Sequence, residues 1–393
     1  MKKFMTAAVA MAMAMSLVAC GGSDKETASA STSNTDSKEG ATFVIGNSGP
    51  LTGGAAVYGN AVKNGIQLAV DEINAAGGIN GYPVKFVCED DEADAEKAVN
   101  AYNTLKDQGM QVMVGTTTSG ACLAVCAETA NDNMFQITPS GTAVKITEPE
   151  NVFRMCFSDP EQGTKAAQYI SENKIAQKVG VIYDSSDPYS AGVYENFAAT
   201  CKEYSLEIVA AEAFTSENKT DFKTQLQKMK DSGAELVLLP FYYTEASLVL
   251  KQAKEMNFAP IFFGCDGMDG ILDLPDFDKS VAEGLYLLTP FSAESTEEPT
   301  ASFVKNYQEK YNDIPIQFAA GAYDSVYVVK AAMEKAGVKP DMSVSEICDA
   351  MKAVMTEIQV DGVTGKGVTF TKEGEPNKQP MAVVVENGAY KLK

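Results

Sequence analysis

The chain has 393 residues, 32 of them basic and 53 acidic, and its formal net charge of −21 at pH 7 argues against binding to nucleic acid or anionic lipid. It contains no histidine, no tryptophan and one arginine, Arg154, which excludes Ser-His-Asp catalysis, Cys-His catalysis and histidine-ligated zinc. An anionic ligand must therefore be bound by hydroxyls, backbone N–H groups, lysines or that single guanidinium.

The N-terminus has the pattern of a secretory signal. A Met-Lys-Lys start is followed by an apolar run over residues 4–19, and the sequence Leu-Val-Ala-Cys ends at Cys20 before two glycines. This sequence resembles a bacterial lipobox, which predicts removal of residues 1–19 and lipidation of Cys20. Residues 20–41 are mostly small and polar, which predicts a flexible tether. No later stretch approaches the roughly 18 apolar residues of a spanning helix, so we expect no membrane crossing in the mature protein.

Strands and helices alternate along the first half of the globular region. We expect strands at residues 42–47, 84–89 and 112–114, with helices at 62–76 and from about 95 to 108. The first helix has apolar residues at 3/4 spacing and stops at Gly77-Gly78. Continuous apolar strands between helices predict a parallel, doubly wound sheet.

The same unit recurs later in the chain. A strand at 206–211, a helix at 221–231 and a strand at 235–239 follow the same order. We therefore predict an α/β protein with two similar lobes. In such sheets, ligands bind at the carboxyl ends of the strands.

Two strand ends of the first lobe are rich in hydroxyls. Residues 116–119 follow one predicted strand and precede a helix at 121–131, and residues 138–142 follow the strand at 135–137. Hydroxyls and free N–H groups at a helix start can bind a carboxylate without arginine. The alternative is ordinary turn and capping chemistry.

The second lobe offers an acid and several aromatic residues at predicted loop positions. Asp266 lies in a Gly-Cys-Asp-Gly sequence after the strand at 261–263, where its carboxylate could bind a ligand ammonium group. Tyr58, Tyr189 and the pair Tyr242-Tyr243 could form an apolar wall around a zwitterion, although each could also serve packing.

The cysteines do not suggest a metal site or a disulfide framework. Seven remain after Cys20, an odd and scattered set without a Cys-x-x-Cys motif. Cys122 and Cys126 could share a helix face, but we expect buried free thiols. No cofactor and no metal are predicted.

Three longer motifs carry a resemblance to a known family. They are Gly-Pro-Leu-Thr-Gly at 49–53 with Tyr58-Gly59, the stretch Leu-Ala-Val-Asp-Glu-Ile-Asn-Ala-Ala-Gly-Gly-Ile-Asn-Gly at 68–81, and Ile-Thr-Pro-Ser-Gly-Thr at 137–142. From about Phe43 onward the chain is similar to type I periplasmic solute-binding proteins of the branched-chain amino-acid (Leu/Ile/Val-binding) ABC transporter group, in lipoprotein form.

The resemblance implies a role for individual residues. The ligand carboxylate would be bound by Ser119, Ser140 and Thr142, and the ligand ammonium by Asp266. Asp266 replaces a longer Glu found in some members of the family. The side-chain pocket would be lined by the aromatic residues Tyr58, Tyr189, Tyr242 and Phe318.

The resemblance also implies the architecture and the working partners. Three crossover strands, near 157–160, 287–291 and 362–370, would join lobe 1 (42–158 plus 289–365) to lobe 2 (159–288 plus 366–393). Hinge closure would bury a free amino acid, which membrane permease subunits would then receive. The protein would be a lipid-anchored extracytoplasmic monomer.

Other readings stay open from the sequence. The same fold could bind an aromatic or polar amino acid, an amide or urea, or the chain could be a sensory ligand-binding protein. An enzyme is not expected, because histidine is absent as a base and Asp266 beside Cys265 would raise the pKa of that thiol. No spacing rule decides which amino-acid side chain is preferred.

Overall fold

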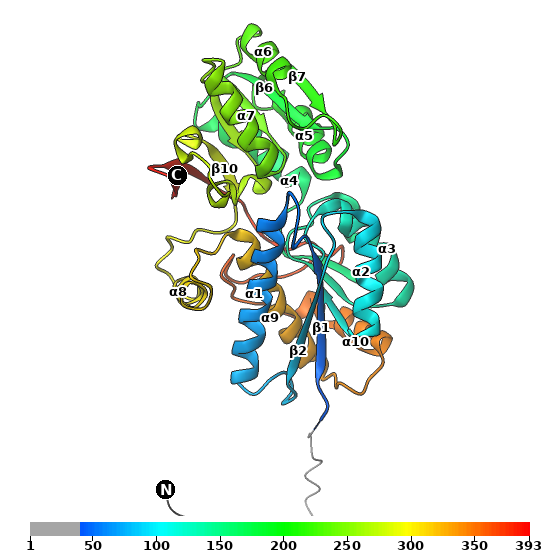
Figure 1. Cartoon of the computed structure of the whole chain (residues 1–393). Coiled ribbons are helices and arrows are strands. Elements are labelled where there is room, and N and C mark those ends of the chain that lie inside the picture. The colour runs from blue at the N-terminus through cyan, green and yellow to red at the C-terminus, as the bar shows by residue number, and fades with distance from the viewer. Residues whose placement is uncertain (1–39) are drawn as a thin grey trace, which may run out of the picture. The chain divides into compact units, whose positions relative to one another are not determined.

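The computed structural model describes residues 40–393. The predicted signal peptide, Cys20 and nearly all of the tether lie outside the described residues. The described part contains two β-sheets, each with helices packed on both faces (Figure 1).

The first sheet has five parallel strands in the order β2-β1-β3-β4-β5. Their bounds are β1 Phe43–Gly49, β2 Val84–Asp90, β3 Val112–Val114, β4 Gln136–Thr138 and β5 Val152–Arg154. Side chains of β3 alternate between the two faces: Val112 and Val114 pack in one core cluster and Met113 in another. Burial on both faces explains why these strands read as continuous apolar runs.

Six helices belong with this sheet, and together they form what we call the first lobe. They are α1 Ala56–Ala75, α2 Ala95–Asp107, α3 Ser119–Asp132, α8 Thr300–Tyr311, α9 Gln317–Ala336 and α10 Val344–Val354, with the short 3-10 helices η1 Val144–Thr147 and η5 Met355–Glu357. Helix α1 packs against α9, and α2 against α3 (Figure 1). Gly65 permits the close approach of α1 to α9, because a Cβ there would lie 2.2 Å from the carbonyl oxygen of Ala319.

The second sheet has seven strands in the order β12-β11-β10-β9-β8-β6-β7. Their bounds are β6 Lys178–Asp184, β7 Glu207–Phe214, β8 Leu236–Leu239, β9 Ile261–Gly264, β10 Tyr286–Thr289, β11 Met381–Glu386 and β12 Ala389–Leu392. Strands β6 to β10 pair in parallel, whereas β11 and β12 are antiparallel additions at one edge. The sequence pattern did not predict this antiparallel hairpin.

Four helices pack on the second sheet and complete the second lobe. They are α4 Asp159–Glu172, α5 Pro188–Cys201, α6 Lys223–Asp231 and α7 Tyr243–Glu255, with η2 Asp266–Met268, η3 Ile271–Asp273 and η4 Lys279–Ala282. Helices α4 and α5 share one core cluster with the sheet, and α6 and α7 pack in another. Within residues 40–393, no helix has both the length and the apolar character needed to span a bilayer.

The chain passes between the two lobes three times. The first pass joins β5 to α4, the second joins β10 to α8, and the third runs from η5 to β11. The third pass contains only isolated bridges, between Val360 and Val368 and between Phe370 and Pro376. The exact lobe boundaries stay predictions.

Candidate functional site

A narrow cavity of about 10 Å³ lies between the carboxyl ends of the two sets of parallel strands. All eight site residues predicted from the sequence line it, together with Thr117, Thr118 and Gly267. The eight are Tyr58, Ser119, Ser140, Thr142, Tyr189, Tyr242, Asp266 and Phe318. Residues from α1, α3, α5, α9, the short helix η2 and three loops are thus brought to one place.

Two hydroxyl-rich loops of the first lobe are bonded to each other. Ser119 Oγ accepts hydrogen bonds from the backbone N–H groups of Thr142 (3.1 Å) and Ala143 (3.3 Å). Ser140 Oγ donates to the carbonyl oxygen of Thr117 at 2.7 Å. Because β3 and β4 are parallel neighbours, their following loops emerge side by side, and these bonds fix the relative position of the hydroxyls.

The N-terminus of α3 faces the same cavity. Ser119 is the first residue of this 14-residue helix, and Thr118 before it has an extended backbone. The first N–H groups of an α-helix have no intrahelical partner, and the helix dipole adds partial positive charge there. A helix N-terminus flanked by Ser119, Ser140 and Thr142 is chemically suited to a carboxylate.

Asp266 supplies negative charge from the second lobe. Its side chain is 5% exposed and accepts a hydrogen bond from the backbone N–H of Gly267 at 2.8 Å. Burial raises the pKa of Asp266 to about 6, although hydrogen bonds from Tyr189 and Gln162 act in the opposite direction. A cationic ligand group beside this carboxylate would favour its ionised form.

The four predicted aromatic residues form one cluster around the cavity. Tyr189 and Tyr242 are stacked with ring centroids 5.5 Å apart, and Tyr58 stacks on Phe318 at 4.2 Å. Tyr58 also meets Tyr242 edge to face at 5.6 Å, which links the two pairs. All four sit at helix starts: Tyr58, Tyr189 and Phe318 lie in the first turns of α1, α5 and α9, and Tyr242 is the N-cap residue of α7.

This placement corrects the expectation that Tyr58 and Tyr189 lie in loops. Helix α1 begins six residues earlier than predicted, at Ala56 rather than residue 62, and α5 begins at Pro188. Proline is favoured in the first turn of a helix, so Pro188 was a signal for this start.

The sequence offered Tyr243 only as a possible part of an apolar wall, yet in the structure it joins the two lobes. Its backbone N–H donates to the hydroxyl of Tyr58 at 3.2 Å, and its own hydroxyl accepts from the N–H of Val57 at 3.1 Å. The Tyr58 hydroxyl in turn donates to the carbonyl oxygen of Gly267. Tyr58 and Tyr243 thus connect α1 of the first lobe to α7 and η2 of the second. In the sequence, the adjacent pair Tyr242-Tyr243 was the only indication of this contact.

Helix α4 contributes polar groups that sequence reasoning also missed. Gln162 Oε1 accepts the backbone N–H of Asp266 at 3.0 Å, and the N–H of Asp159 donates to the carbonyl oxygen of Thr142 at 3.0 Å. Several buried side-chain atoms near the cavity have no partner in the described protein: Thr117 Oγ1, Thr118 Oγ1, Asp159 Oδ1 and Gln162 Nε2. Unpaired polar atoms are unfavourable in a protein interior, which is consistent with a polar ligand.

Neither the arginine nor the cysteines line the cavity. Arg154 contacts the far side of the 138–147 loop, so its guanidinium is not among the groups that could touch a ligand there. Six of the seven cysteines of the described region are buried and Cys88 is partly so, and all are free thiols. Within residues 40–393, no three Cys, Asp or Glu side chains gather in a way that could bind a metal ion.

The family model for periplasmic binding proteins matches residues 42–389. The chain belongs to this family. It is 31% identical over 346 residues to the Leu/Ile/Val-binding protein BraC3 of Rhizobium johnstonii, covering 87% of this chain and 91% of that protein. Membership confirms the prediction of a binding protein rather than an enzyme.

Solved structures of similar proteins agree with the fold. The substrate-binding protein LivJ of Streptococcus pneumoniae, solved in complex with isoleucine, has a TM-score of 0.81 and 32% identity, covering 89% of this chain and 98% of LivJ. The leucine-binding protein LivK of Thermotoga maritima has a TM-score of 0.80 and 25% identity, covering 89% and 97%. The predicted fold class, two α/β lobes of the type I periplasmic binding protein, is confirmed.

Proposed function

We propose that this protein is the extracytoplasmic substrate-binding component of an ABC importer and that it binds a free aliphatic amino acid, of the branched-chain type, in the cavity between its lobes. The observation that carries the proposal is the placement of a buried acid, Asp266, opposite a helix N-terminus lined with hydroxyls. Such a site offers complementary partners for both charges of a zwitterion.

The carboxylate end of the ligand binds at the first lobe. The hydroxyls of Ser119, Ser140 and Thr142 and the N-terminal N–H groups of α3 provide donors without a cationic side chain. In the described structure, Ser119 Oγ already receives two N–H groups, so its own proton can be donated to a carboxylate oxygen.

The ammonium end binds at Asp266 in the second lobe. Burying a charged ammonium is unfavourable unless a carboxylate or several acceptors receive it, and Asp266 is the acid that lines the cavity. The aliphatic side chain lies against Tyr58, Tyr189, Tyr242 and Phe318, whose rings give an apolar wall. The names of the relatives BraC3, LivJ and LivK support the branched-chain class.

Ligand capture follows from having one charge partner on each lobe. The first-lobe hydroxyls bind the carboxylate in an open form, and closure about the three chain passes brings Asp266 and the tyrosines onto the ammonium and side chain. The bonds of Tyr58 to Gly267 and Tyr243 then hold the lobes together. The closed form presents the ligand to the permease subunits of the importer.

The N-terminal sequence supports a lipid anchor at Cys20 and a body outside the cytoplasm, which we propose is a monomer. Replacing Cys20 by Ala should move the full chain from the membrane fraction to the soluble fraction. Retention at the membrane would contradict the anchor.

Binding is tested by a thermal-shift screen of residues 41–393 against the twenty amino acids and their deaminated analogues. A ligand at 100 times its dissociation constant stabilises the folded state by about 2.7 kcal/mol, a shift of several degrees. We expect leucine, isoleucine or valine to raise the midpoint and 4-methylpentanoate, which lacks the amine of leucine, to leave it unchanged. Stabilisation by amine-free compounds alone would contradict the role of Asp266.

A further inference from the structure

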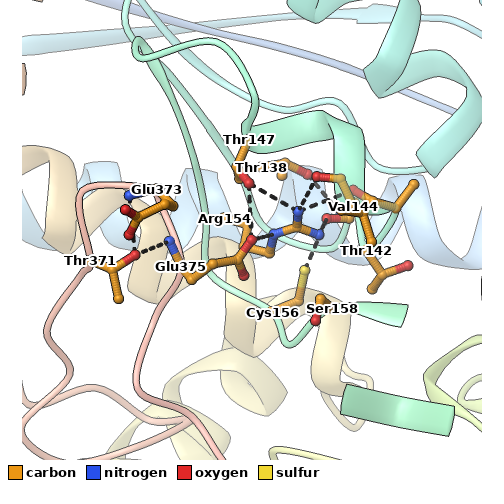
Figure 2. A network of polar contacts seen from close by, with 12 residues as sticks. Thr138, Thr142, Val144, Thr147, Arg154, Cys156, Ser158, Thr371, Glu373 and Glu375 are labelled. Atoms are coloured by element: carbon orange, nitrogen blue, oxygen red, sulfur yellow. Dashed lines mark hydrogen bonds and ion pairs between the residues drawn. The ribbon is translucent and has the colours of Figure 1, made fainter. Parts of the chain in front are cut away.

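Arg154, the single arginine of the sequence, is completely buried at the end of β5. Its guanidinium contacts the loop over residues 138–147, which carries Ser140 and Thr142 (Figure 2). Arg154 therefore contacts residues that line the proposed ligand site without lining the site itself.

The guanidinium binds three backbone carbonyl oxygens within four residues of this loop. Nη1 donates to the carbonyl oxygen of Gly141 at 3.2 Å, and Nη2 donates to those of Ala143 (3.0 Å) and Val144 (3.2 Å). Nη2 also lies 3.2 Å from Thr147 Oγ1. These contacts turn the carbonyl groups of the loop toward Arg154.

The orientation of one peptide unit links these contacts to the cavity. In a trans peptide, the C=O and N–H groups point in opposite directions. The unit between Gly141 and Thr142 directs its carbonyl to Arg154 and its N–H to Ser119 Oγ, at 3.1 Å. If this unit were rotated, a carbonyl oxygen would face the carboxylate site and repel an anion.

Glu375 holds the guanidinium from the other side. Its Oε1 lies 3.0 Å from Arg154 Nε and accepts a hydrogen bond from Thr147 Oγ1 at 2.9 Å. The backbone N–H of Arg154 donates to the carbonyl oxygen of Gly374 at 3.0 Å. The turn at residues 371–375, part of the third pass between the lobes, thus clamps Arg154 against the loop (Figure 2).

We propose that Arg154 is a positioning residue of the ligand-binding site: by holding the carbonyl groups of Gly141, Ala143 and Val144, with Glu375 as its counterion, it keeps the N–H groups of the 138–147 loop directed at Ser119 Oγ and so orients the hydroxyls that bind the ligand carboxylate. The proposal rests on the proposed function for the identity of the ligand. Arginine suits the role because its planar fork carries five donors, whereas a lysine ammonium is a compact charge that cannot span three carbonyls.

The test compares Arg154→Lys and Glu375→Gln with Ile170→Val, a core substitution in α4 that lowers stability without touching the loop. Amide hydrogen exchange of the free protein is measured first. We expect faster exchange in the 138–147 segment for Arg154→Lys, a smaller increase for Glu375→Gln and no local change for Ile170→Val. Unchanged exchange in this segment would overturn the proposal, whatever the protein binds.

Leucine affinity is measured next by calorimetry on the folded variants. We expect Arg154→Lys to weaken leucine binding about tenfold, because the loss of one correctly oriented donor removes the net free energy of one hydrogen bond. Ser119→Ala combined with Arg154→Lys should weaken binding by less than the product of the single effects, because both act on the Thr142 N–H. The effect of Tyr243→Phe, which alters a contact between the lobes, should instead multiply with that of Arg154→Lys.

A purely structural role predicts a different pattern. Arg154→Lys would then lower the unfolding midpoint, as Ile170→Val does, and leave leucine affinity unchanged. The double variant would bind leucine as weakly as Ser119→Ala alone. This result would overturn the proposal. If the wild-type protein binds no amino acid, the proposed function fails, and the exchange data still decide whether Arg154 orients the loop.

Discussion

The first-lobe wall of the cavity consists of hydroxyls and backbone N–H groups that already bond to one another, whereas the second-lobe wall presents a buried carboxylate. Ser119 Oγ, for example, receives the N–H groups of Thr142 and Ala143, so the donors are held in place before a ligand arrives. Asp266 is equally buried, but its pKa is raised to about 6 by desolvation. One wall is neutral and preorganised, and the other carries a charge that is unfavourable without a cation.

This difference has a defined effect on stability. An Asp whose pKa is higher in the folded than in the unfolded state stabilises the fold fully below its unfolded pKa, near 3.9, and this contribution is lost as the pH rises through the folded value of about 6. At pH 7 the ionised Asp266 therefore destabilises the free protein. The acid that we propose for ligand binding in the second lobe thus lowers the stability of the free protein, whereas the bonded hydroxyls of the first lobe do not.

The largest expected effect comes from removing the acid. Asp266→Asn should weaken amino-acid binding by about 2–5 kcal/mol, the range for stripping one partner from a buried charge pair. The free variant should nevertheless unfold at a higher temperature at pH 7, since about two units of raised pKa correspond to at most about 3 kcal/mol. Calorimetric titration and thermal unfolding measure the two changes.

Asp91→Asn is the matched control for this variant. Asp91 is completely buried, its pKa is also raised to about 6 by desolvation, and it bonds Ser48 rather than lining the cavity. It should alter stability and leave affinity unchanged. Equal losses of affinity in both variants would remove Asp266 from its proposed role.

The next effect concerns the neutral wall. Ser119→Ala leaves two N–H groups without their acceptor and removes a donor to the carboxylate, so binding should weaken by about 1–3 kcal/mol. Unlike Asp266→Asn, it should also lower the unfolding temperature of the free protein. Ser48→Ala removes another buried hydroxyl outside the cavity, and a loss of affinity there would show that the effect of Ser119 is not specific.

The pH dependence of binding separates the walls without mutation. The ligand ammonium requires ionised Asp266, so affinity should fall about tenfold between pH 7 and pH 5, as expected for a group of pKa about 6. Titration at several pH values measures this decline. In Asp266→Asn the remaining weak binding should be nearly independent of pH over the same range, and a persistent decline would assign the dependence to another group.

The smallest effect tests the contacts that join the lobes. Tyr243→Phe removes the hydroxyl that accepts from the N–H of Val57, and we expect a loss of about 1 kcal/mol that appears mainly as faster ligand release. Stopped-flow release of ligand measures it. Tyr102→Phe removes a comparable hydroxyl, bonded to Asp132 within the first lobe, and should leave the release rate unchanged.

The sequence determined those features that follow from local pattern and chain order. Apolar runs and 3/4 spacing predicted the alternating strands and helices, and the carboxyl ends of β3 and β4 brought Ser119 and Ser140 together as expected for neighbouring parallel strands. The absence of histidine and of an arginine cluster limited the carboxylate site to hydroxyls, N–H groups, lysines or Arg154. The resemblance assigned roles to Asp266 and the tyrosines and added Phe318.

Tertiary structure alone decided how residues distant in the chain support these groups. Arg154 meets Gly374 and Glu375 more than 200 positions away, and Tyr243 meets Val57 across the lobes. No period or local motif encodes such pairs, because they arise only when three passes of the chain bring the two lobes and their connecting segments together. Periodicity specifies which face of an element is buried, whereas packing of the lobes determines which buried polar groups become partners.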